Sequence, residues 1–155
     1  MESTTTERIT LTRELVIDAS PETVWGFLTD PEKIARWKGT AATFDPTPHG
    51  RHRTEVLPSH TAVGEVLEID PPRRLVLSWG WENGSWEVPA GATTIEYELV
   101  PEGSGTRLKF THRDLPSKES ADSHGIGWDH YHERLAVAAT GGDPGPDPWL
   151  TERMK

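Results

Sequence analysis

Histidines are the residues of this chain best suited to chemistry, and seven occur among its 155 residues. An imidazole can carry a proton or anchor a ligand near neutral pH. His124 and His132 are eight residues apart, about two turns along one face of a helix, and His112 ends the segment just before. Five histidines lie in segments predicted to be strand or helix: His52, His112, His124, His130 and His132.

Three interpretations of these histidines are open. They are structural or face solvent, they anchor a ligand, or three of them converge on a zinc ion. The chain contains no cysteine and no His-Glu-x-x-His run. We therefore expect no metal site and no cofactor.

Glu65 is the carboxylate of most interest, because its neighbours along the predicted strand are apolar. If it points inwards it needs a partner or a shifted pKa, and Arg53, Glu55 and Arg74 are candidate partners. The alternative is a bulged strand on which Glu65 and Glu68 lie on opposite sides and at least one is solvated.

Seven tryptophans stand against three phenylalanines and two tyrosines. Large rings line cavities as readily as they fill cores, so both interpretations of the tryptophans are kept.

Charge and composition narrow the function classes. The formal net charge of −9 opposes binding to nucleic acid. No stretch is apolar enough to serve as a signal or membrane segment, and the absence of cysteine fits a reducing compartment. We expect a cytoplasmic protein with no membrane partner.

Two short helices are predicted between Ser20 and Trp37. Ser20 and Asp30 can cap helices, and the proline that follows each of them suits a first helical position. Period-two alternation then predicts strands at residues 9–17, 41–44, 51–57, 62–69, 74–81, 93–100 and 106–113. Asn83-Gly84 predicts a turn, after which Trp86 and Val88 are expected to extend the hairpin.

Residues 117–140 are predicted to form the helix that covers the sheet, because apolar residues recur there at three- and four-residue steps. Gly125 and Gly127 interrupt it, and they indicate either a cavity mouth and a close strand contact or a kinked first turn. Residues 141–155 are expected to be a loosely packed Pro/Gly-rich tail with Trp149 as an anchor.

Several short motifs follow one another in a fixed order along residues 9–140. They are ASPETVW (19–25), LTDPE (28–32), ARW (35–37), GEVLEIDPP (64–72), RLVLSW (74–79), GTRL (105–108), TH (111–112) and GW (127–128). In this combination the chain resembles the START-like, or SRPBCC, superfamily of helix-grip proteins. Within it, the chain is similar to the subfamily named after the activator of the heat-shock protein 90 ATPase. It departs from relatives at His52, where they tend to carry a large ring.

The resemblance implies an α+β helix-grip fold. Its curved antiparallel sheet of six or seven strands wraps around a long C-terminal helix, and two short helices follow strand one. We expect a flexible N-terminus (1–8), one START-like domain (9–140) and the tail (141–155). The resemblance also implies a cavity between sheet and helix, and its predicted lining is Trp37, His52, Glu65, Leu77, Trp79, Trp81, Tyr97, Phe110, His112, His124, Trp128 and His132.

The favoured hypothesis is the binding of a small, largely hydrophobic molecule in this cavity. The alternatives are a cyclase- or dehydratase-like enzyme in which His112, His124 or Glu65 moves protons, and a chaperone-associated regulator. A homodimer is a further possibility.

Overall fold

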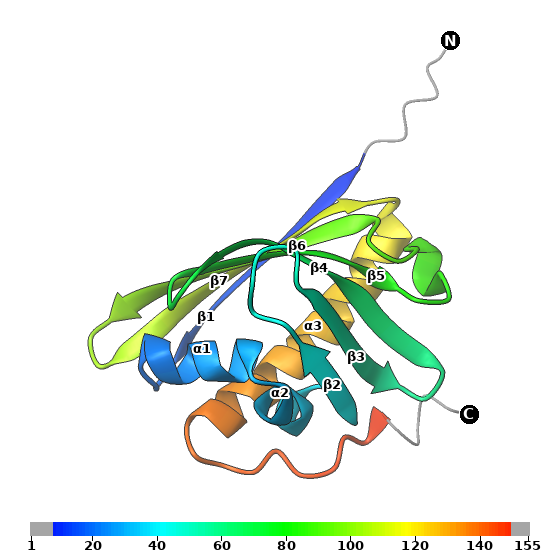
Figure 1. Ribbon diagram of the computed structural model, residues 1–155. Coiled ribbons are helices and arrows are strands. Elements are labelled where there is room, and N and C mark those ends of the chain that lie inside the picture. Colours follow the sequence, from blue (N-terminus) through cyan, green and yellow to red (C-terminus); the bar gives the residue numbers. More distant parts are fainter. Residues whose placement is uncertain (1–7, 150–155) are drawn as a thin grey trace.

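A single sheet of seven antiparallel strands, in the order β1-β7-β6-β5-β4-β3-β2, curves around one long helix (Figure 1). The computed structural model describes residues 8–149. Its elements are β1 (Ile9–Ile17), α1 (Pro21–Thr29), α2 (Pro31–Trp37), β2 (Ala41–Phe44), β3 (Arg51–Leu57), β4 (His60–Asp70), β5 (Arg74–Trp81), η1 (Ser85–Glu87), β6 (Thr93–Glu102), β7 (Gly105–Leu115) and α3 (Lys118–Ala139). The predicted helix-grip fold is confirmed, with seven strands.

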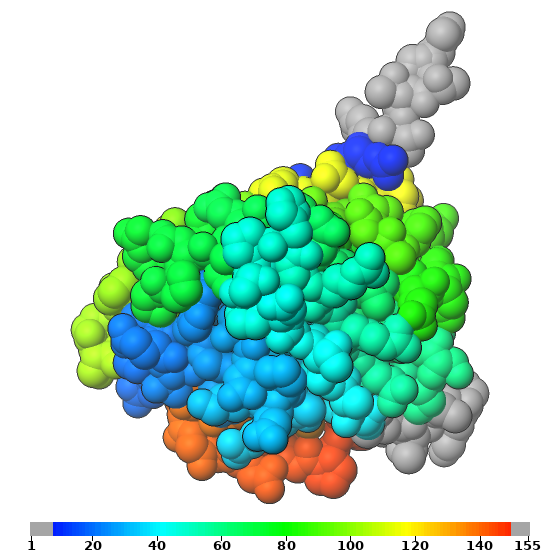
Figure 2. Space-filling view, in the orientation of Figure 1, coloured from blue at the N-terminus to red at the C-terminus, as the bar shows by residue number. Residues whose placement is uncertain are grey.

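Both short helices begin as their caps predict. The Ser20 side chain accepts a hydrogen bond from the Thr23 backbone N–H, and the Asp30 side chain accepts one from Glu32. Each cap thus satisfies a backbone donor that the first helical turn leaves without a partner. In the space-filling view α1 and α2 (blue) lie beside the segment through β2 and β3 (cyan), with the C-terminal tail (orange) beneath them (Figure 2).

The structure differs from the prediction after β5. Trp86 and Val88 do not extend the hairpin, because the chain turns into the single-turn helix η1 instead. Trp86 and Glu87 both have left-handed backbone angles, with φ of 51° and 66°. Ser120 of α3 donates a hydrogen bond to the Trp86 carbonyl (3.0 Å), and this bond holds the turn against the helix.

The two glycines of α3 do not break the helix, which is continuous from Lys118 to Ala139. Gly125 packs so closely on β1 that an added Cβ would lie 2.8 Å from Arg13 Nη2. At Gly127 an added Cβ would meet no atom within 4 Å. The structure therefore supports the first interpretation, in which one glycine permits a close strand contact and the other leaves open space.

The described part of the tail, residues 141–149, is held against the helices by hydrogen bonds and ring stacking. Arg134 of α3 donates to the carbonyls of Trp37 (3.1 Å), Pro144 (3.2 Å) and Gly145 (2.9 Å), so one guanidinium joins α2, α3 and the tail. The Trp149 ring stacks on His130 with ring centroids 3.8 Å apart. The predicted flexible residues 1–7 and the end of the tail lie outside the described residues.

His52 of β3 reaches across the neighbouring strand to the one beyond it. It pairs with Gly64 of β4, and its Nε2–H donates to the Ser78 carbonyl of β5 at 2.7 Å. A Cβ on Gly64 would overlap that carbonyl and lie 2.7 Å from His52 Nε2. Glycine at 64 is therefore what leaves room for the His52 ring to reach β5.

Gly64→Ala should lower the free energy of unfolding by about 3 kcal/mol, because the methyl group displaces backbone as well as the His52 ring. Urea unfolding followed by far-UV circular dichroism measures the loss. Gly127→Ala is the control, and it should instead add up to about 1 kcal/mol by removing a helical glycine without a clash. Equal stability of wild type and Gly64→Ala would contradict the close approach.

Candidate ligand pocket

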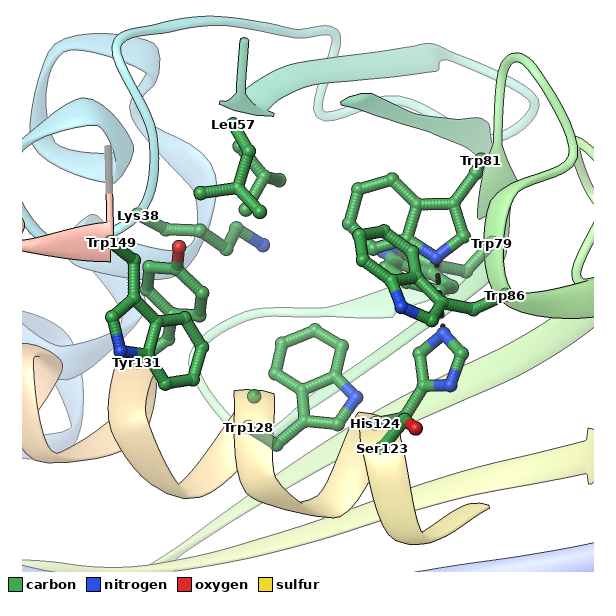
Figure 3. Close-up of a pocket in the computed structure, with 12 residues that line it drawn as sticks. Lys38, Leu57, Trp79, Trp81, Trp86, Ser123, His124, Trp128, Tyr131 and Trp149 are labelled. Atoms are coloured by element: carbon green, nitrogen blue, oxygen red, sulfur yellow. Dashed lines mark hydrogen bonds between the residues drawn. The ribbon is translucent and has the colours of Figure 1, made fainter. Parts of the chain in front are cut away.

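A pocket of about 60 Å³ lies between α3 and the ends of β3 and β5, and it is closed on one side by η1 and on the other by the tail (Figure 3). Its walls are mainly indole rings and aliphatic side chains. The lining residues are Lys38, Val56, Leu57, Trp79, Trp81, Trp86, Ser123, His124, Gly127, Trp128, Tyr131 and Trp149.

The pocket has a buried floor and a partly exposed mouth. Trp79, Trp81 and Trp128 form much of the floor, and each is at most 6% exposed. Trp86, Ser123, Gly127 and Trp149 are less buried, and they form the rim. Trp86 and Trp149 belong to η1 and to the tail, outside the sheet and the long helix. The two rings that close the pocket are therefore attached to short connecting segments.

Trp81 and His124 join the sheet to the helix across the pocket floor. The Trp81 Nε1–H donates to His124 Nε2 at 3.0 Å, and His124 Nδ1–H donates to the Ser120 carbonyl at 2.7 Å. Both ring nitrogens of His124 are thus used, one as acceptor and one as donor, which requires the neutral ring. Burial lowers the pKa of His124, which also favours the neutral ring, although the bond to Ser120 acts to raise that pKa.

His112 and Trp128 make a second link of this kind. Trp128 Nε1–H donates to His112 Nδ1 at 3.0 Å. The opposite nitrogen, Nε2, donates to the Thr93 hydroxyl at 2.8 Å, since that hydroxyl gives its own proton to the Trp79 carbonyl. Burial, with a smaller contribution from His124, lowers the pKa of His112 to about 3.

Two further histidines are buried and neutral. His132 Nε2 lies 2.8 Å from the Tyr97 hydroxyl, and burial lowers the His132 pKa to about 3. Burial also lowers the pKa of His52 to about 4, although the bond to Ser78 opposes it. Near neutral pH these imidazoles therefore carry no charge.

Lys38 places an ammonium group among these rings. Its Nζ lies 4.9 Å from the centre of the Trp37 ring and 5.3 Å from that of Trp128. Burial lowers the pKa of Lys38 to about 8, so the amine is mostly protonated at pH 7. Lys38 and Trp79 also belong to the wall of a second, inner cavity of about 20 Å³.

The local backbone explains why Lys38 points inwards. Lys38 ends α2, and Gly39 follows with a left-handed φ of 81°. A Cβ on Gly39 would overlap the Glu55 carbonyl, and Thr40 N–H donates to that same carbonyl at 2.9 Å. The chain is thereby pressed against β3 immediately after Lys38.

Four predicted cavity residues line this pocket: Trp79, Trp81, His124 and Trp128. Four others line the inner cavity: Trp37, His52, Leu77 and Tyr97. Phe110, His112 and His132 line neither, and they pack beneath the tryptophans; the Phe110 and Trp128 ring centres are 4.6 Å apart. His112 and His124 do converge, with ring centres 5.5 Å apart.

Glu65 lies outside both cavities, contrary to its predicted place in the lining. Its side chain is 46% exposed and lies 3.5 Å from His49 Nδ1. A register shift between Val66 and Glu68 shows the predicted bulge, and the Glu68 side chain is 51% exposed. Val66 takes the inward position, so both carboxylates are solvated.

The prediction missed Lys38, Trp86, Tyr131 and Trp149 among the lining residues. Trp86 depends on a left-handed turn, and Trp149 on the path of the tail. Tyr131 follows Trp128 by three residues on α3, so helical spacing alone could have found it.

Residues 8–149 contain neither a metal-binding cluster nor a membrane-spanning helix. No group of three histidine or acidic side chains is arranged to hold a metal ion. No helix in that range is both long and apolar enough to cross a membrane.

The curved sheet, the long covering helix and the pocket between them define a helix-grip protein. The family model for activator of Hsp90 ATPase homolog 1-like proteins matches residues 18–140. The chain belongs to this family.

Solved structures agree with this assignment. The solution structure of an AHSA1-like protein from Rhizobium etli is 42% identical over 100% of this chain and 96% of its own, with a TM-score of 0.76. CalU16 from Micromonospora echinospora is 27% identical over 87% and 86%, with a TM-score of 0.67. The Aha1 dimer from Colwellia psychrerythraea, at 16% identity over 86% and 98%, shares the fold with a TM-score of 0.74. No curated protein matched the chain.

The buried histidines predict acid sensitivity. The unfolded chain takes up protons near pH 6.5, whereas His52, His112 and His132 resist protonation down to pH 4 or 3 when folded. Stability should therefore be complete above pH 6.5 and fall below it. Each buried imidazole adds to the slope, which approaches roughly 1 kcal/mol per pH unit for each group once the unfolded chain is protonated.

Urea unfolding at pH 7, 6 and 5 measures that slope. His52→Gln keeps a donor for Ser78 but does not titrate, so it should reduce the slope by about a third. His49→Gln is the control, since the His49 side chain is 82% exposed. A stability independent of pH between 7 and 5 would show that these histidines are not held neutral.

Proposed function

We propose that this protein binds a small, largely apolar molecule in the pocket between the sheet and α3. The observation that carries the proposal is a solvent-facing pocket whose floor is built from three buried tryptophans. Such rings offer large apolar contact areas at a low cost in side-chain entropy. Membership of a helix-grip family supports the same conclusion.

The ligand enters by displacing the rings at the mouth. At about 60 Å³ the pocket is well below the roughly 300 to 1,000 Å³ of typical ligand sites. Trp86 and Trp149 are the movable parts of the wall, because they lie on η1 and on the tail. Their displacement joins the pocket to the solvent without disturbing the sheet or α3.

Binding is favoured over acid–base catalysis by the histidine contacts. Both ring nitrogens of His124 and of His112 are engaged within the protein. The carboxylate–histidine pairs found within residues 8–149, His130–Asp147 and His49–Glu65, do not line the pocket. A general base would need a free nitrogen within reach of the substrate.

Gly127→Phe tests the pocket directly. The new ring should fill the mouth and abolish binding of a neutral aromatic compound, naphthalene-2-carboxamide, measured by calorimetry and by quenching of tryptophan fluorescence. The fold should persist, since a Cβ at Gly127 meets nothing within 4 Å. At a hundred times the dissociation constant, the same compound should stabilise the wild type by about 2.7 kcal/mol.

Ile126→Phe is the matched control. Ile126 is 59% exposed and lies outside the pocket, so the same ring added there should leave binding unchanged. The proposed function would be refuted if the wild type bound neither this compound nor the matching carboxylate saturably, or if Gly127→Phe bound the compound as well as the wild type does.

A further inference from the structure

The Lys38 ammonium is a charged group in a pocket whose other walls are mainly aromatic and aliphatic. Its stem follows α2, and its Nζ projects into the pocket between the sheet and α3 (Figure 3). Two indole faces hold the charge, those of Trp37 and Trp128. Indole faces attract a cation but accept no ordinary hydrogen bond from it.

No ion pair or hydrogen bond links Lys38 Nζ to any residue between 8 and 149. Among the described lysines, Lys118 pairs with Asp122 at 2.9 Å, whereas Lys33 and Lys109 also lack a carboxylate partner. Of these three unpaired lysines, only Lys38 lines the pocket. The imidazoles nearest to Lys38 are neutral, and an imidazole has no negative charge with which to compensate the ammonium.

We infer that the ligand of this pocket joins an apolar ring system to an acidic group, such as a carboxylate, and that the Lys38 ammonium is the partner of that group. This inference rests on the proposed function and specifies its ligand class. A buried ammonium without a partner is costly, and a ligand anion supplies both the missing charge and the missing acceptors. The surrounding rings receive the apolar body.

The depth of Lys38 agrees with this arrangement. It lies at the inner end of the pocket, where it also forms part of the inner cavity wall, whereas Trp86 and Trp149 lie at the mouth. A ligand therefore enters with its acidic end first and leaves its ring body between the tryptophans. Burial lowers the pKa of Lys38 to about 8, and a bound anion would raise it again.

The test compares two compounds of the same shape, naphthalene-2-carboxylate and naphthalene-2-carboxamide, by calorimetry at pH 7. The wild type should bind the carboxylate about 10- to 100-fold more tightly, as expected for a buried charge-assisted hydrogen bond. Lys38→Met keeps the length of the side chain and removes the charge. It should weaken carboxylate binding by the same factor and leave carboxamide binding unchanged.

Lys33→Met is the matched control. Lys33 is also on α2 and also lies over a ring, with Nζ 5.6 Å from the centre of Phe27, but it does not line the pocket. It should preserve the preference for the carboxylate. The melting temperature of Lys38→Met checks that the fold is intact. It should be no lower than that of the wild type, because the substitution removes a desolvated charge.

The pH dependence separates Lys38 from its neighbours. Carboxylate affinity should fall between pH 7 and 9 as Lys38 loses its proton, while carboxamide affinity stays constant. Burial keeps the neighbouring imidazoles and the Tyr97 phenol uncharged over this range. His52 and His132 lie close enough to Lys38 for its charge to lower their pKa values, and Tyr97, His124 and Tyr131 share a cavity wall with it.

The outcomes are distinguishable. If both compounds bind the wild type equally and Lys38→Met changes neither affinity, the inference fails while the proposed pocket stands. If neither compound binds, the proposed function fails and the inference with it.

Discussion

The interior of this protein depends on acceptors for three buried indole N–H groups, those of Trp37, Trp81 and Trp128. Trp81 donates to His124, Trp128 to His112, and Trp37 to the Phe27 carbonyl at 2.8 Å. A buried donor left without a partner would cost about 1–3 kcal/mol. Two of these bonds connect the sheet to α3 and the third connects α2 to α1, so the same requirement positions every layer around the pocket.

These bonds also decide what chemistry the interior can perform. A histidine that accepts from an indole and donates to a carbonyl or a hydroxyl has no free nitrogen, and protonating it would break the acceptor bond. The histidines that suggested catalysis therefore hold the sheet on the helix. The Lys38 ammonium is the one charged group of the pocket that has no ion-pair partner within residues 8–149. The pocket is therefore better suited to recognising a ligand than to transferring protons.

Local signals predicted most of the fold. The Ser20 and Asp30 caps marked two helix starts. Period-two alternation located seven strands, four of them with the boundaries found in the structure and three with boundaries within two residues of it. These signals act between near neighbours in the chain. The turn at Trp86 was not predictable in this way, because left-handed angles at two non-glycine residues require tertiary contacts such as the Ser120 bond.

The pocket was only partly predictable for the same reason. Trp79, Trp81 and Trp128 follow from strand alternation and helical spacing. Lys38 and Trp149 do not, since the first depends on the turn at Gly39 and the second on a tail held by Arg134 and His130. Glu65 shows the converse case, because its place next to the inward Val66 on β4 puts a carboxylate that was predicted to point inwards on the solvent side.

The net charge of −9 does not conflict with a ligand that carries an acid. Surface carboxylates are screened beyond about 8 Å at physiological ionic strength, whereas the Lys38 ammonium acts over contact distance within an aromatic enclosure. The negative surface slows the approach of an anion more than it weakens the bound state. A neutral ring would occupy the same walls but leave the ammonium desolvated and without a partner. Selection for an acidic ligand thus comes from the ion pair with Lys38, which only the anion can form.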